Sequence, residues 1–151
     1  ETDALKAGAD GLLLLDLPPE EAAQDLPKRG DLKRIVLVAP TSPEDRVRSL
    51  VTSASGFVYY VSREGVTGMQ KSLPPGLREK VSFLKKSTPL PVCVGFGISS
   101  PEQATQVAAL SDGVVVGSAI VDRIGKLGKS PQLLQEVVSF LQPIARAVHA
   151  A

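Results

Sequence analysis

The 151-residue chain is 43% hydrophobic and 22% charged, so it carries enough apolar side chains for one globular unit, and we expect a single domain over residues 1–151. Seventeen basic and sixteen acidic side chains leave a net charge of +1, which argues against a protein that binds nucleic acid or an anionic membrane through a basic patch. No apolar run approaches the roughly 20 residues of a membrane-spanning helix, and the first residues do not resemble a signal peptide.

The first ten residues, ETDALKAGAD, have the pattern of the end of a helix. Leu5 lies on its apolar side and Gly8 suits the C-terminal cap. A chain that opens with the end of a helix and then enters a strand suggests part of a longer protein. A short helix native to this N-terminus is the alternative.

Strand and helix patterns then alternate along the rest of the chain. The strand predictions are short, nearly continuous runs of Val, Leu, Ile and aromatic residues, a pattern typical of strands covered on both faces. The helix predictions begin at prolines, and one has Ser42 as its N-cap with Pro43 at its first position. In chain order the elements are strand 12–15, helix 19–29, strand 35–39, helix 43–54, strand 57–61, helix 75–87, strand 91–95, helix 101–110, strand 114–117 and helix 131–148.

This alternation predicts an α/β fold of parallel strands joined by right-handed crossovers. Five such units fit part of a (β/α)8 TIM barrel. They are also the number found in a five-stranded, open, doubly wound sheet of the flavodoxin type. The pattern alone leaves both architectures open.

Residues for metal or nucleophilic chemistry are scarce. Cys93 is the only cysteine, which favours a reducing compartment, and its place between Val92 and Val94 indicates an inert core position. His149, the only histidine, lies three residues from the end of the chain. We therefore expect neither a metal site nor a histidine-dependent catalytic triad.

Two glycine-containing loops follow consecutive strands and lead into helices. In GFGISS, Gly95 and Gly97 expose backbone before a helix with Ser100 as N-cap and Gln103 in capping-box position. In VGSAIVDRI, Gly117 and Ser118 precede a short extra helix. The loops after the last two strands of a barrel, together with such a helix, form a recurring phosphate site. A purely conformational need for glycine is the alternative for either loop alone.

The stretch YYVSREGVTG ends a third strand. Alternation places Tyr59 on one face of the sheet, where it can point toward a ligand, and Tyr60 on the other, under a helix. That both tyrosines are core residues is the alternative, which the pattern alone supports equally. The loop that holds Thr67 and Gly68 is long enough to close over a ligand.

The stretches GADGLLLLDLPPEE, APTSP, GFVYYVSREGVTG, PVCVGFGISSPEQ and DGVVVGSAIVDRI resemble the later part of the tryptophan synthase α subunit, especially its bacterial members. The resemblance covers nearly the whole chain in order. It implies strands 4–8 of a TIM barrel and a lyase of tryptophan biosynthesis, which cleaves indole-3-glycerol phosphate to indole and glyceraldehyde 3-phosphate. It also implies a bacterial cytoplasmic protein without a cofactor of its own. The partner is a β subunit that carries pyridoxal phosphate, in a heterotetramer.

The resemblance also assigns roles to particular residues. Gly68, Gly97, Gly117 and Ser118 match the phosphate cradle of the family, and Thr67 matches the threonine of its mobile loop. Tyr59 matches the tyrosine near the substrate, with a supporting role in catalysis, and Phe96 lines the pocket. Asp16 ends the first strand and has a less definite role.

The family's two catalytic carboxylates belong to the second barrel strand and the loop after it, which have no counterpart in this sequence. A complete barrel takes at least about 200 residues, so 151 residues do not hold one. We therefore expect phosphate binding without appreciable catalysis by this chain alone. Two alternatives remain: a non-catalytic flavodoxin-like phosphate-binding module, and a half-barrel that self-associates through exposed sheet edges.

Overall fold

The computed structural model describes residues 2–13, 15, 32–61, 73–95 and 97–151. Strands and helices alternate through this part of the chain, at nearly the positions that the apolar runs predict. None of the described helices is long and apolar enough to cross a membrane. The elements are α1 (Thr2–Lys6), β1 (Gly11–Leu13), β2 (Lys33–Val38), α3 (Glu44–Ser53), β3 (Val58–Val61), α4 (Leu77–Ser87), β4 (Val92–Gly95), α5 (Pro101–Ala108), β5 (Gly113–Val115), α6 (Ser118–Leu127) and α7 (Leu133–His149).

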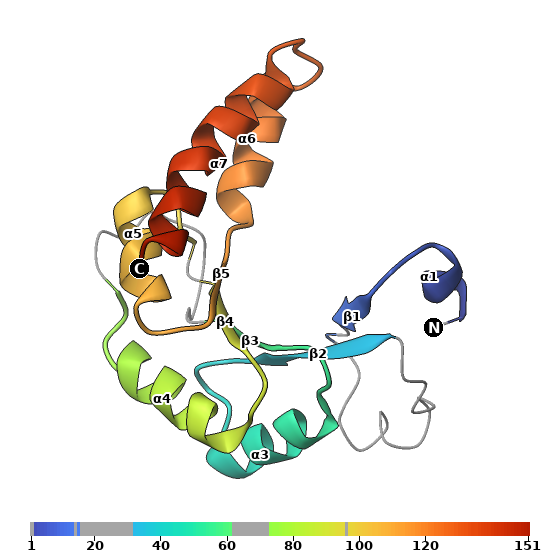
Figure 1. Ribbon diagram of the computed structural model, residues 1–151, viewed down its shortest axis with the longest axis vertical. Helices are drawn as coiled ribbons and strands as arrows, with labels where there is room; N and C mark the ends of the chain where they lie inside the picture. The colour runs from blue at the N-terminus through green and yellow to red at the C-terminus, as the bar shows by residue number, and fades with distance from the viewer. Residues whose placement is uncertain (1, 14, 16–31, 62–72, 96) are drawn as a thin grey trace.

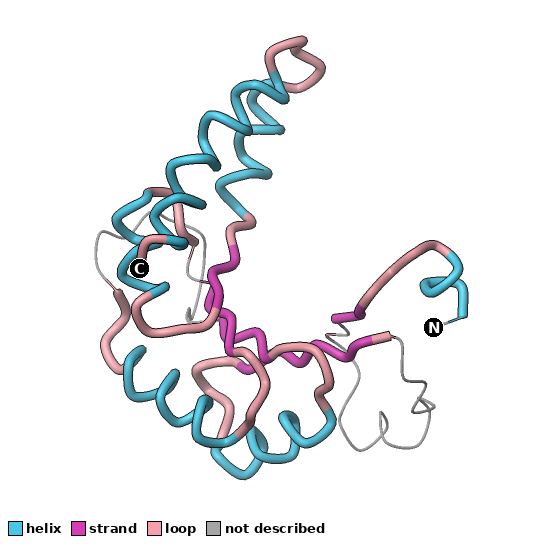
Figure 2. The backbone as a smooth tube through the Cα atoms, in the orientation of Figure 1, coloured by secondary structure: helices cyan, strands magenta, loops and turns pink. Residues whose placement is uncertain are grey.

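The five strands form one parallel sheet whose spatial order, β1-β2-β3-β4-β5, is the order of the chain. Right-handed crossovers that always step in the same direction place every connecting helix on the same side of the sheet. Figure 1 shows α3, α4 and α5 along the outer side of a curved sheet, as in part of a barrel, and the magenta strands of Figure 2 follow one arc. A doubly wound sheet reverses direction and has helices on both faces. The flavodoxin-like alternative is therefore wrong.

The core lies between this sheet and its outer helices. Alternate strand residues face the helices and are almost fully buried, and they meet the apolar faces of α3, α4 and α5. The opposite face of the sheet holds half-buried residues, as the alternating burial of β3 shows. The continuous apolar runs predicted cover on both faces, but the described helices cover only one. The core residues are Val36, Val38, Val47, Val51, Val58, Tyr60, Leu77, Val81, Leu84, Val92, Val94, Ile98, Ala104, Val107 and Ile144.

The first turn of α3 differs by one residue from the prediction. Pro43 is the N-cap and the helix begins at Glu44. The hydroxyl of Ser42 does not cap the helix; it accepts a hydrogen bond from the Ala39 N–H at 3.2 Å. At the N-terminus, Gly8 follows α1 with φ +83°, the left-handed conformation expected of a glycine cap. The helix predicted over residues 19–29 lies outside the described residues.

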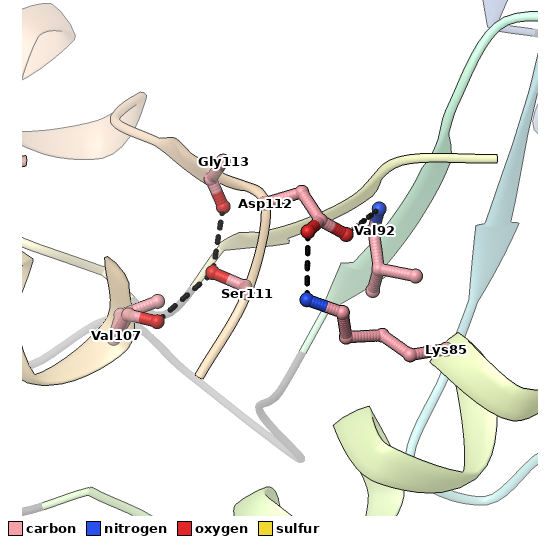
Figure 3. A network of polar contacts seen from close by, with 6 residues as sticks. All are labelled: Lys85, Val92, Val107, Ser111, Asp112 and Gly113. Carbon is pink, nitrogen blue, oxygen red and sulfur yellow. Dashed lines mark hydrogen bonds and ion pairs between the residues drawn. The ribbon is translucent and has the colours of Figure 1, made fainter. Parts of the chain in front are cut away.

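A polar network joins α4, β4 and β5 at the amino ends of the strands (Figure 3). Asp112 accepts a hydrogen bond from Lys85 Nζ at 2.7 Å and, through its second oxygen, one from the Val92 N–H at 3.0 Å. These interactions, the one with Lys85 foremost, lower the pKa of Asp112. The Ser111 hydroxyl lies 2.9 Å from the carbonyl oxygens of Val107 and Gly113. The network fixes the end of the sheet opposite to the glycine loops.

Candidate phosphate site

The two glycine-containing loops lie side by side at the carboxyl edge of the sheet. Strands β4 and β5 pair in parallel with Gly95 opposite Val115. Gly97 follows Gly95 by two residues and Gly117 follows Val115 by two residues. Both loops therefore begin at the same level along the strand direction. Neighbouring strands are about 4.8 Å apart, a separation that one phosphate group spans.

The start of α6 has the features of an anion site. The helix begins at Ser118, its N-cap Gly117 supplies no side chain to cap it, and its first turn holds no acidic residue. The first amides of a helix have no acceptor within the helix and carry the positive end of its dipole. Gly117 and Ser118 are exposed, and a Cβ placed on Gly117 would meet no atom within 4 Å. The first turn of α6 thus offers exposed N–H donors and a hydroxyl beside open space.

The start of α5 is already occupied by its own side chains. Ser100 is the N-cap with Pro101 after it, and its hydroxyl accepts from the Gln103 N–H at 3.4 Å. The Gln103 side chain accepts from the Ser99 N–H at 2.9 Å, one residue earlier than the predicted capping box requires. Exposed Glu102 also lies in this turn, and its hydrogen bond with the Ser100 side chain lowers its pKa. Satisfied donors and a carboxylate make α5 a poorer seat for phosphate than α6.

Gly97 lies in the loop between β4 and α5, exposed and with φ +67°. This backbone conformation strains most residues that have a Cβ. The positive φ alone therefore explains a glycine at this position, with or without a ligand. The contribution of Gly97 to phosphate binding stays a prediction.

Tyr59 and Tyr60 lie on opposite faces of β3, as alternation predicts. Tyr60 is buried among the helices, and Tyr59 is half-buried on the other face. A Cβ placed on Gly95 would lie 2.5 Å from the Tyr59 hydroxyl oxygen, so the Tyr59 ring crosses over this glycine. The sequence suggested that Gly95 lets a ligand approach the backbone, whereas the space next to it holds the Tyr59 ring. Burial raises the pKa of Tyr59, so its phenol stays protonated near neutral pH and can donate a hydrogen bond.

Cys93 lies on the same face as Tyr59, not in the core beneath the helices. It pairs in register with Tyr59 on one side and Gly113 on the other. Its side chain is half-buried, and a Cβ placed on Gly113 would lie 2.7 Å from its Sγ. Burial, and to a lesser extent the charge of Asp112, raises the pKa of Cys93. A protonated thiol is a poor nucleophile, which agrees with the expectation that Cys93 is chemically inert.

The remaining predicted site residues, Thr67, Gly68 and Phe96, lie outside the described residues, and so does Asp16. Within the described ranges, no group of three or more His, Cys, Asp or Glu side chains could hold a metal ion. Of the predicted site residues, Tyr59, Gly97, Gly117 and Ser118 are therefore described, and their roles in binding stay predictions. The sequence did not indicate the packing of Gly95 against Tyr59.

The comparisons with known proteins all identify the same family. The family model "Tryptophan synthase alpha chain" matches residues 2–149. The chain is 50% identical over 131 residues to the tryptophan synthase alpha chain of Opitutus terrae, covering 85% of this chain and 49% of that protein. It is 47% identical over 148 residues to that of Geobacter sulfurreducens, covering 97% and 56%.

Solved structures agree. A Mycobacterium tuberculosis tryptophan synthase structure superposes with a TM-score of 0.83 at 37% identity, covering 97% of this chain and 54% of that one. The α-subunit from Pyrococcus furiosus gives a TM-score of 0.82 at 29% identity, covering 95% and 58%. The chain spans about half the length of the relatives it matches. With a family match over nearly its entire length, the chain belongs to the tryptophan synthase α chain family.

Proposed function

We propose that this chain is the phosphate-binding part of a tryptophan synthase α chain. The phosphate group of indole-3-glycerol phosphate, or of the product glyceraldehyde 3-phosphate, would lie between the first turn of α6 and the loop that precedes α5. The observation that carries the proposal is the uncapped, acid-free start of α6 beside the loop that follows β4. A dianion there would accept hydrogen bonds from backbone N–H groups and from the Ser118 hydroxyl, and would interact favourably with the helix dipole.

The family reaction needs two proton transfers that a phosphate cradle does not supply. One group protonates the indole ring and another deprotonates a hydroxyl of the glycerol chain. The family resemblance assigns these steps to carboxylates outside residues 1–151. Tyr59, with its raised pKa, would donate a hydrogen bond rather than act as a base. We therefore propose that the 151-residue chain binds the phosphate end of the substrate and does not turn it over alone.

The partners follow from the family. A tryptophan synthase β subunit would receive the indole and would carry the pyridoxal phosphate, whereas this chain would need no cofactor. The assembly would be cytoplasmic.

Titration calorimetry with glycerol 3-phosphate tests the cradle. Ser118→Asp adds a negative charge where the phosphate would bind, and we expect at least about a tenfold loss of affinity. An acidic residue in the first turn favours the helix, so this variant does not lose binding by unfolding. Ser82→Asp, at an exposed position of α4, is the matched control and should bind as the parent does. Unchanged affinity in Ser118→Asp contradicts the proposal.

A second pair of variants separates charge from backbone strain at Gly97. Asn and Asp both tolerate positive φ better than other residues with a side chain. Gly97→Asn and Gly97→Asp therefore carry a similar conformational cost at φ +67°. We expect the Asp variant to bind glycerol 3-phosphate more weakly than the Asn variant. Equal affinities would leave Gly97 a purely conformational residue.

Catalysis is tested by an indole-formation assay with and without an N-terminal fragment of a related α chain. We expect indole only in the mixture. Turnover by the chain alone would show that residues 1–151 contain the acid and base after all.

A further inference from the structure

We draw no further inference here: the strongest candidate, the cavity of about 570 Å³ between the starts of α3 and α4 over Tyr60 and Phe83, carries none, because nothing in the described part of the chain shows what occupies it and the charged side chains that line it, Glu44, Glu79 and Lys80, are exposed and of mixed sign.

Discussion

Replacing Gly95 with alanine should strain the sheet through one side chain, Tyr59. The added Cβ would lie 2.5 Å from the Tyr59 hydroxyl oxygen, 2.7 Å from Cε2 and 3.0 Å from Cζ. Ordinary van der Waals contact begins near 3.4 Å, so the phenol has to retreat by about 0.9 Å at its tip. Gly95 does not have positive φ, so its backbone conformation adds no strain of its own.

Overpacking of this size costs about 1–3 kcal/mol. The half-buried ring has some freedom to move away from the strand, which favours the lower part of that range. Urea unfolding followed by circular dichroism measures the loss. In a chain of this length each kcal/mol corresponds to a change in Tm of about 2–4 °C.

The decisive comparison is a double-mutant cycle. In a Tyr59→Val background the ring is absent, and Gly95→Ala should then cost about 0.5 kcal/mol or less. The coupling free energy between the two positions should therefore be about 1 kcal/mol or more. An equal cost of Gly95→Ala in both backgrounds would refute the idea that the glycine exists to admit the tyrosine ring.

Three further predictions concern stability. Gly125→Ala should stabilise the protein by about 0.5–1 kcal/mol, because Gly125 is within α6 and an added Cβ meets no atom within 4 Å; a destabilised variant in urea unfolding would contradict this. Lys85 lowers the pKa of Asp112, so their interaction stabilises the fold above the unfolded pKa of about 3.8 and is lost as pH falls through the lower folded value. Asp112→Asn should cost about 0.5–1 kcal/mol at pH 6 and less at pH 2.5; an equal loss at both pH values would rule out the ionic contribution. Ser100→Ala should cost about 1 kcal/mol by removing the α5 cap, with Ser100→Gly milder, and thermal unfolding of the pair tests that order.

The order and type of elements follow from sequence because the dominant signal is local. Apolar runs of four or five residues mark buried strands, and prolines with acidic neighbours mark the starts of α3 and α5. Alternation along β3 also separates Tyr59 from Tyr60 correctly. These inferences need only residues that are adjacent in the chain.

The packing of side chains between neighbouring strands cannot be predicted from residues that are adjacent in the chain. That the Tyr59 ring fills the space beside Gly95 depends on the register between β3 and β4, which pairs Tyr59 with Cys93. Nothing in the sequence near residue 95 records which neighbouring side chain occupies that space. The same limit explains Cys93, whose apolar neighbours suggest the core although it lies on the opposite face.

The N-caps of α3 and α5 could be predicted only in part. Ser42 and Ser100 have similar sequence contexts, each followed by proline and an acidic residue, yet only Ser100 caps its helix. The Ser42 hydroxyl instead bonds to the Ala39 N–H in the preceding turn. Competition between a cap and a local turn is decided by the path of the incoming chain, which the sequence leaves open.

The weak anchoring of α6 has a consequence for its dynamics. None of its described residues is buried, and it packs mainly along α7, with Arg123 lying 3.9 Å above the Phe140 ring. Its amides should therefore exchange with deuterated solvent through local opening, well before those of β3 and β4. Because its first turn is also the proposed seat of the phosphate, a bound dianion would slow exchange along α6 in proportion to its occupancy.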